Sequence, residues 1–386
     1  MTSALAVLAD STDTGLRVAP TDPRLHPIAD KVLAGERLTP EDGLVLFEST
    51  DLLGIGALAD WSNRQKNGDR VFVCANQHLN PTNVCILRAT CTFCSFARTP
   101  REDGAYTMTL EEAFHEASMA SDTPVREFHI VGGLHPRLRL SYYEDLIRGL
   151  RERHPGVEVK ALTAVEIAHL ARIEKSSVED VLIRLREAGM DTMPGGGAEV
   201  FAKGVRATIA QRKLAAEEWI DVHRRAHGLG IRTNCTMLYG HVESLNDRVD
   251  HLVMLRELQD ETGGFLTYIP LAYHPDNNEL GEELGRTGTA TTGFDDLKNL
   301  AIGRLFLDNI RHIKTHWIMN TAKVSQIALH FGVDDLEGTV RRERIYHDAG
   351  AATPEGMTFA EIVRLVKDAG KRPVERNVRY EEVRQW

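Results

Sequence analysis

The sequence predicts an α/β protein whose main body is a (β/α) barrel, complete or partly open, with helices before it and a charged tail after it. Short β-rich runs alternate with amphipathic helical patterns from about residue 67 onward. Repeated units of this kind imply parallel strands joined by right-handed crossovers. Glycine-rich and polar clusters follow the predicted strands, and parallel α/β barrels carry their active sites at the C-terminal ends of their strands.

The predicted elements divide the chain into three parts. Residues 1–66 form an N-terminal tail and helical segment, 67–345 form the barrel, and 346–386 form a C-terminal helix and tail. Apolar residues three and four positions apart predict helix from residue 27 to about 66. The predicted strands are 71–74, 128–131, 157–162, 191–193, 232–238, 265–269 and 313–318, with a weaker eighth near 331–333, and the helices between them are 110–121, 142–153, 177–188, 215–229, 246–261, 295–309 and 323–329.

Length, charge and hydropathy exclude several classes of protein. A chain of 386 residues can bury a large core without disulfides or a structural metal. Its 46 basic and 56 acidic residues give a net charge of −10, whereas nucleic-acid binders usually carry a basic face. Stretches without charged residues are too short to cross a bilayer. We therefore expect a cytoplasmic protein that binds neither nucleic acid nor a membrane.

Three of the five cysteines lie close together after the first predicted strand; they are Cys85, Cys91 and Cys94. Thiolates are soft ligands that suit zinc or an iron–sulfur cluster. Three ligands would leave one iron of a cluster open to a substrate, whereas structural zinc would need a fourth ligand, for which His78 is nearest. Inert buried thiols are the remaining interpretation. The other two, Cys74 and Cys235, are expected to pack within strands.

Glycines follow two of the predicted strands, at Gly132-Gly133 and at residues 195–197. Glycine lets backbone amides and carbonyls approach a ligand closely. Both runs are therefore candidate ligand contacts, with a tight βα turn as the alternative interpretation.

Carboxylates also gather at the predicted strand ends; they are Glu166, Glu199 and Glu243. Three that converge on one face suggest recognition of hydroxyl or ammonium groups, or proton transfer. His241, beside Glu243, is either an acid or base or a hydrogen-bonded structural histidine. Arg206 and Lys213, after the glycine-rich loop, either meet a carboxylate or begin a solvated helix.

The cysteine motif and these loops resemble the radical S-adenosylmethionine (SAM) superfamily. Its members typically have C-x3-C-x2-C with an aromatic residue before the last cysteine. Here Phe93 precedes Cys94, but five residues separate Cys85 from Cys91. A longer loop still brings three thiolates to one cluster.

Within that superfamily the chain resembles the aminofutalosine synthase family of the futalosine route to menaquinone, over nearly its whole length. The dehypoxanthine futalosine cyclases share some of these runs, but residues 312–314 and 334–339 are similar to the synthases. The matching runs are GGLHP (132–136), TAVEI (163–167), PGGGAEVF (194–201), TMLYGHVES (236–244), RELQDETGGF (256–265), LDNIRHIKTHWIMN (307–320) and FGVDDLEGTV (331–340).

The resemblance implies a (β/α) barrel of radical SAM type and a role for each site residue. The three clustered cysteines would hold a [4Fe–4S] cluster whose open iron binds SAM. The implied SAM-binding residues are Phe93 near the adenine, Gly132 and Gly133 near the methionine amine, Thr163 and Glu166 near the ribose or methionine, and Gly240 and Glu243 after the fifth strand. We add four catalytic candidates, Glu199, Arg206, His241 and Lys314, and expect Arg206 and Lys314 to meet the carboxylates of the substrate.

The resemblance also implies an activity. The enzyme would add the 5′-deoxyadenosyl radical of SAM, consumed as a substrate, to the aryl enolpyruvyl ether 3-[(1-carboxyvinyl)oxy]benzoate. The products would be 6-amino-6-deoxyfutalosine, methionine and carbon dioxide or bicarbonate, and a one-electron reductant such as flavodoxin or ferredoxin would start the reaction. Two alternatives stay open: a cyclase-like radical SAM enzyme and a non-catalytic iron–sulfur electron carrier, which would leave the glycine-rich barrel loops unexplained.

Overall fold

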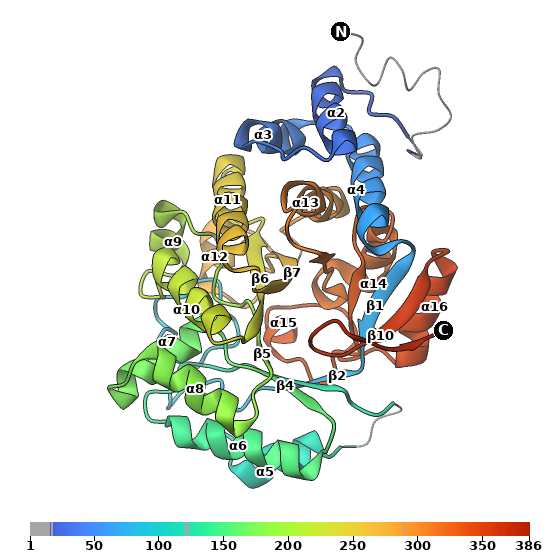
Figure 1. The fold of residues 1–386 in the computed structure, drawn as a ribbon. Coiled ribbons are helices and arrows are strands. Elements are labelled where there is room, and N and C mark those ends of the chain that lie inside the picture. The colour runs from blue at the N-terminus through green and yellow to red at the C-terminus, as the bar shows by residue number, and fades with distance from the viewer. Residues whose placement is uncertain (1–15, 17, 120–122, 289) are drawn as a thin grey trace.

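The structure is a computed structural model that describes residues 16, 18–119, 123–288 and 290–386. Its frame consists of two sheets (Figure 1). The larger is a curled, seven-stranded parallel sheet in the order β2-β3-β4-β5-β6-β7-β8, and the smaller has the order β11-β10-β1-β9. The strands are β1 (Arg70–Cys74), β2 (Asn76–Leu79), β3 (Glu127–Ile130), β4 (Glu158–Ala161), β5 (Thr192–Met193), β6 (Arg232–Tyr239), β7 (Phe265–Ala272), β8 (His312–Ile313), β9 (Asp335–Gly338), β10 (Arg372–Arg376) and β11 (Glu382–Gln385).

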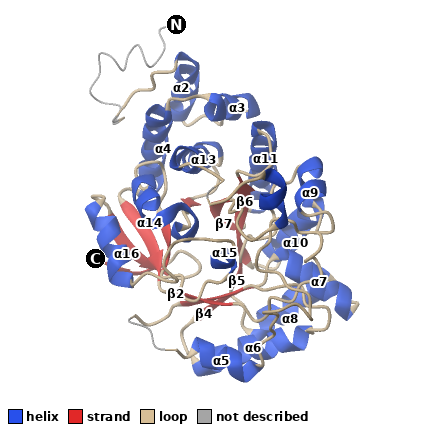
Figure 2. Ribbon diagram, turned by 180° about the vertical axis from the view of Figure 1, so that it is seen from behind, coloured by secondary structure: helices blue, strands red, loops and turns tan. Residues whose placement is uncertain are grey.

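Helices cover the outer face of the curled sheet (Figure 2). The N-terminal helices extend this layer, since α3 packs on α11 and α4 packs on α13. Among the described helices, none is long and apolar enough to span a membrane. The helices are the 3-10 turn η1 (Pro23–Leu25), α2 (His26–Ala34), α3 (Pro40–Glu48), α4 (Leu52–Asn67), α5 (Leu110–Ala117), α6 (Leu140–Arg153), α7 (Ala164–Glu174), α8 (Val178–Ala188), α9 (Lys203–Ile209), α10 (Ala216–Gly228), α11 (Leu245–Thr262), α12 (Glu279–Leu284), α13 (Gly293–Phe306), α14 (Trp317–Ala328), α15 (Ile345–Asp348) and α16 (Phe359–Asp368).

Side-chain caps determine where the loops after β4 and β6 become helices. Thr163 caps α7 and Ser244 caps α11, and the carboxylates of Glu166 and Asp247 accept hydrogen bonds from the backbone N–H of Thr163 and Ser244. Such a capping box satisfies N–H groups that begin a helix without partners, and loss of the cap typically costs about 1 kcal/mol. The loops after β4 and β6 therefore end at defined positions along the same edge of the sheet.

The predicted fold class is confirmed, because seven parallel strands and their helices form a partly open barrel. Several strand positions are nevertheless wrong. The predicted first strand, 71–74, is β1 of the smaller sheet, and the barrel begins with β2, whose sequence NQHL has one apolar residue. Residues 313–318 contain only the end of β8 before α14 begins, and the weak strand near 331–333 lies just before β9. Helix α7 was not predicted.

The C-terminal residues differ from the helix and charged tail expected for 346–386. Helix α16 is followed by β10, which is mostly buried and pairs in parallel with β1. The charge of this segment misled the prediction, because Arg376 is fully buried between carboxylates. The division at residues 66 and 345 stays a prediction. Residues 1–15 of the predicted N-terminal tail and 120–121 of the predicted helix 110–121 lie outside the described residues.

Candidate active site

A cavity of about 270 Å³ opens at the C-terminal ends of the barrel strands. Its walls come from the loops after β2, β3, β4, β5, β7 and β8, and the segment around α15 contributes a further wall. The fold thus brings residues together from across the whole barrel. Those predicted from the sequence that line the cavity are Cys85, Cys91, Phe93, Cys94, Gly132, Gly133, Thr163, Glu166, Gly195, Gly196, Gly197, Glu199, Lys213 and Lys314, together with His78, the nearest fourth ligand considered for zinc.

The three clustered cysteines share one wall of this cavity. Burial raises the pKa of the Cys85 and Cys91 thiols, in the case of Cys91 to about 12. Among the described residues, the trio of His, Cys, Asp or Glu ligand atoms found within 4.8 Å of one another does not include these cysteines. Three thiols that line one cavity match the ligand set of an iron–sulfur cluster with one iron open to a ligand.

A lysine and a glutamate form an ion pair beside the cysteines. The ammonium group of Lys213 contacts the carboxylate of Glu199 and lies 5.1 Å from the centre of the Phe93 ring. Burial opposes its charge, but Glu199 and the Cys91 thiolate together raise the pKa of Lys213 above its usual range. The pair therefore places one fixed cation and one fixed anion next to the cysteine wall.

Glu166 is buried between two site loops. Its carboxylate accepts hydrogen bonds from the N–H of Gly132 at 2.9 Å and from the N–H of Thr163 at 2.7 Å. Burial raises the pKa of Glu166 to about 7, although these hydrogen bonds oppose the shift. Glu166 lines the cavity, but its observed partners show that it also ties the loop after β3 to the start of α7.

The two glycines after β3 approach protein backbone rather than open space. A Cβ on Gly133 would lie 2.4 Å from the carbonyl oxygen of Val84, and one on Gly132 would lie 2.9 Å from that of Thr82. The segment that they contact leads directly into Cys85. The structure therefore supplies a packing reason for both glycines, in addition to the ligand contact expected from the sequence.

Four predicted site residues lie outside the cavity lining; they are Arg206, Gly240, His241 and Glu243. Arg206 donates to the carbonyl oxygens of Ala198 at 2.5 Å and of Leu214, and so clamps the glycine-rich loop instead of facing the cavity. Glu243 accepts hydrogen bonds from the N–H groups of Gly240 at 2.6 Å and His241 at 2.9 Å. The contacts among Gly240, His241 and Glu243 therefore hold the loop after β6 in its conformation.

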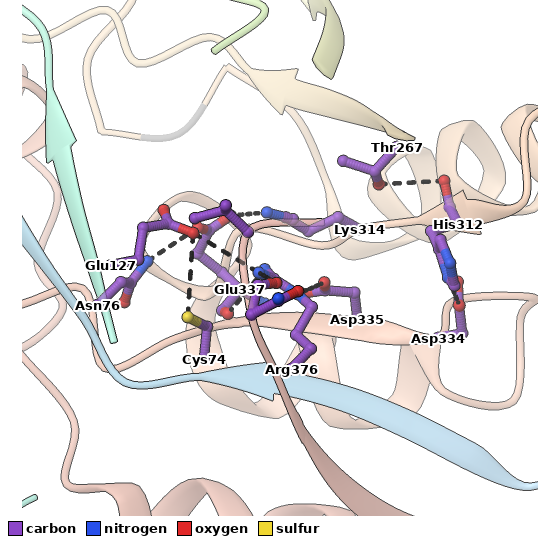
Figure 3. Close-up of polar contacts among 12 residues, drawn as sticks. Cys74, Asn76, Glu127, Thr267, His312, Lys314, Asp334, Asp335, Glu337 and Arg376 are labelled. Carbon is purple, nitrogen blue, oxygen red and sulfur yellow. Dashed lines mark hydrogen bonds and ion pairs between the residues drawn. The ribbon is translucent and has the colours of Figure 1, made fainter. Parts of the chain in front are cut away.

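A buried network of charges was not predicted (Figure 3). Two of its members, Lys314 and Glu337, line the cavity. Lys160 donates to both oxygens of Glu127, at 2.8 and 2.9 Å, and Arg376 lies 3.6 Å from the same carboxylate and 2.6 Å from Asp335. Lys314 pairs with Glu337 at 2.8 Å. The sequence held a partial signal for this network, because residues 127 and 129 lie two apart in a strand and so share one face. It could not show their partners, which lie more than 30 residues away in the chain.

Part of this network forms the trio mentioned above, Glu127, His129 and Glu337, whose ligand atoms lie within 4.8 Å of one another. Each carboxylate already holds a cation: Lys160 for Glu127 and Lys314 for Glu337. A metal ion would have to displace or face these cations. We therefore assign this trio to the structure rather than to metal binding.

Comparison with known proteins agrees with this geometry. The radical SAM superfamily model matches residues 79–255, and the model described as CofH/MqnC C-terminal region matches residues 262–386. Methylornithine synthase, a solved structure, shares the fold, with a TM-score of 0.70 at 17% identity over 90% of this chain and 97% of that chain. The chain is a radical SAM enzyme, a class whose members use SAM and a [4Fe–4S] cluster.

Two relatives define the family more closely. Aminodeoxyfutalosine synthase of Thermus thermophilus is 48% identical over 365 residues, which cover 95% of this chain and 97% of the relative. The protein of the same name from Streptomyces coelicolor is 45% identical over 93% of this chain and 94% of its own. The chain belongs to the aminodeoxyfutalosine synthase family, which confirms the resemblance found in the sequence.

Proposed function

We propose that this enzyme joins the 5′-deoxyadenosyl group of SAM to 3-[(1-carboxyvinyl)oxy]benzoate and forms 6-amino-6-deoxyfutalosine on the route to menaquinone. In this reaction C5′ bonds to the vinyl CH₂ carbon, and the aryl group moves from the ether oxygen to the neighbouring carbon. The enolpyruvyl carboxylate leaves with the unpaired electron and ends as carbon dioxide or bicarbonate. One electron enters and one leaves, so the net reaction is redox-neutral.

The observation that carries this proposal is the shared cavity wall of Cys85, Cys91 and Cys94 in a chain 48% identical to a named synthase. Three thiols that line one cavity fit a [4Fe–4S] cluster with one open iron. Such a cluster, when bound, supplies the electron that cleaves SAM to methionine and a 5′-deoxyadenosyl radical. We infer that a reductant such as flavodoxin or ferredoxin delivers that electron.

The chain's own residues would bind SAM and exclude water. The ion pair of Lys213 and Glu199 complements the carboxylate and ammonium groups of a methionine moiety beside the cysteines. Phe93 offers a ring face for stacking, and the buried Glu166 holds the loops after β3 and β4 in place. Tyr346 and its neighbours around α15 form one wall of the cavity, and a site that excludes water protects a reactive radical from side reactions.

Product analysis with labelled SAM tests this proposal. Reduced enzyme, the aryl enolpyruvyl ether and SAM labelled in the adenosyl group should give labelled 6-amino-6-deoxyfutalosine and an equal amount of methionine, measured by mass spectrometry. Label confined to free 5′-deoxyadenosine would contradict the proposal and favour a cyclase-like enzyme. Absence of SAM cleavage would favour an electron carrier. The Cys91→Ala variant, which should give neither product, is the matched control.

A further inference from the structure

One wall of the cavity carries buried polar atoms that have no hydrogen-bond partner in the protein. They are both ring nitrogens of His78, Nδ1 of His129, Nδ1 of His316 and Oδ1 of Asn234. Nδ1 of His129 lies 3.8 Å from a carboxylate oxygen of Glu127, beyond hydrogen-bond distance. His78, His316 and Asn234 are only 4%, 6% and 2% exposed. A buried polar atom left without a partner costs about 1–3 kcal/mol, so native proteins seldom keep several together without a use.

The fold gathers these side chains from four segments. His78 in β2 pairs in register with His129 in β3, and their rings stack with centres 4.5 Å apart and planes 21° from parallel. Asn234 comes from β6, and His316 follows β8 with its ring 5.2 Å from that of Tyr346. We call His78, His129 and His316 the histidine wall.

Three carboxylates of the cavity lining are paired with cations, and Glu166 accepts backbone hydrogen bonds, in contrast to this wall. Lys213 holds Glu199, Lys314 holds Glu337, and His347 holds Glu343 at 3.2 Å. Each neutral imidazole offers one N–H donor and one acceptor nitrogen. Burial lowers the pKa of His78 and His129 to about 3, so both rings are neutral near pH 7.

The histidine wall and the cysteines come from different segments of the cavity lining. His78 and His129 lie in β2 and β3 and His316 follows β8, whereas Cys85, Cys91 and Cys94 lie in the loop after β2. The reacting enolpyruvyl group must lie near C5′ of SAM, which would bind beside the cysteines. The other end of the same substrate, an aromatic ring that carries a carboxylate, would then reach the histidines.

We propose that the histidine wall binds the ring carboxylate of the aryl substrate through imidazole N–H groups and so selects carboxylated rings. This inference rests on the proposed function. It replaces Arg206, which the sequence suggested for a substrate carboxylate and which the structure places in a loop clamp. In this assignment the three imidazoles bind the substrate and take no part in the radical step.

Two substrates and two variants test this assignment. The first substrate is 3-[(1-carboxyvinyl)oxy]benzoate, and the second is the same ether without the ring carboxylate, 2-phenoxyacrylate. His78→Phe and His129→Phe keep a flat ring but remove its nitrogens. We expect kcat/KM for the carboxylated ether to fall about 10- to 100-fold, mainly through KM, because a hydrogen bond to a charged group is lost. For 2-phenoxyacrylate it should change less than about threefold.

Controls separate binding from structure. His223→Phe alters another fully buried histidine with an unpartnered Nε2, outside the cavity lining, and should leave the preference between the two ethers unchanged. His129→Gln keeps an N–H donor and should recover part of the loss. Visible iron–sulfur absorbance and thermal melting check that each variant is folded and loaded.

The outcomes are distinct. Equal losses on both ethers, or no loss on either, would overturn the inference while leaving the proposed function intact. If neither phenylalanine variant incorporates the iron–sulfur cluster, the wild-type enzyme provides the test. A ratio of kcat/KM for the carboxylated ether to that for 2-phenoxyacrylate below about threefold would then overturn the inference. A wild-type enzyme that joins neither ether to the adenosyl group would overturn the proposed function and this inference with it.

Discussion

For single residues in this cavity, an existing ion pair determines how the side chain can interact with a ligand. Lys213 and Lys314, the lysines that line it, each hold a glutamate. In a low-dielectric site, removing one partner of an ion pair costs more free energy than the intact pair contributes to stability, because the remaining charge stays buried. Charged groups of the ligands would therefore exchange partners within existing pairs, and the neutral histidines supply directed hydrogen bonds.

The cysteine assignment makes a prediction at this scale. Replacing Cys85, Cys91 or Cys94 singly with alanine should abolish the visible iron–sulfur absorbance of the reconstituted enzyme and its SAM cleavage, because each would supply one of three ligands. Cys74→Ala is the matched control, since Cys74 is fully buried in β1 and lies outside the cavity lining. A cluster that survives in Cys85→Ala but not in Cys74→Ala would show that the ligand set is wrong.

At the scale of elements, the sequence predicted where the site loops lie better than it predicted the structural role of each residue within them. The glycines after β3 were expected to face a ligand, yet their missing side chains make room for the backbone before Cys85. Helix α7 was missed although Thr163 and Glu166 have the spacing of a capping box, so a usable signal was present. The clamp role of Arg206 had no such signal, because backbone carbonyls as partners leave no pattern in a sequence.

Gly133 therefore gives a prediction that couples two loops. Gly133→Ala places a Cβ 2.4 Å from the carbonyl oxygen of Val84, which must shift the segment entering Cys85. We expect weaker cluster incorporation, measured as iron per chain and visible absorbance, along with weaker SAM binding. Gly204→Ala, where a Cβ meets nothing within 4 Å, is the control. Full cluster loading with only SAM affinity reduced would favour the ligand-contact explanation instead.

The short helix α15, which helps to cover the cavity, should respond to pH. A hydrogen bond from His347 to Glu343 raises the pKa of this histidine from 6.5 to about 9. Its folded pKa exceeds its unfolded pKa, so the stabilisation is complete below pH 6.5 and is lost as pH rises towards 9. After allowance for solvent screening, we expect this interaction to contribute about 1–2 kcal/mol to the free energy of unfolding at low pH.

Urea unfolding at pH 6 and pH 9 measures this contribution. Between these two pH values, the free energy of unfolding should fall by about 1–2 kcal/mol more in the wild type than in His347→Gln. His115→Gln, which alters an exposed histidine at the end of α5, should behave as wild type. Identical pH dependence in wild type and His347→Gln would contradict the assignment.

At the scale of the whole molecule, the two sheets share one hydrophobic core and are also joined by buried charges. Strands with apolar runs, such as β6 and β7, could be predicted because each carries its own signal. β2, β9 and β10 could not, because their sequences NQHL, DLEG and RPVER are polar and yet almost wholly buried. Partners from distant segments neutralise these charges, and a single sequence does not reveal which acid meets which base.

Arg376 gives the prediction that belongs to this scale. It is fully buried in β10 and joins Asp335 of β9 at 2.6 Å to Glu127 of β3 at 3.6 Å, so it links the C-terminal strands to the barrel (Figure 3). Arg376→Met would leave two buried carboxylates short of one cation, which typically costs 3–5 kcal/mol in unfolding free energy, on the order of several hydrogen bonds. Urea unfolding measures this loss. Arg384→Met is the control: Arg384 is exposed in β11, and its buried partner Glu375 keeps an ion pair with Arg126 at 3.0 Å, so stability should change by less than about 1 kcal/mol. Lys314, paired within the same network at the cavity, should lose order in the Arg376 variant, so SAM-dependent product formation should fall before the protein unfolds. Stability and activity equal to those of the Arg384 variant would mean that the C-terminal strands are an appendage to the barrel and not part of its frame.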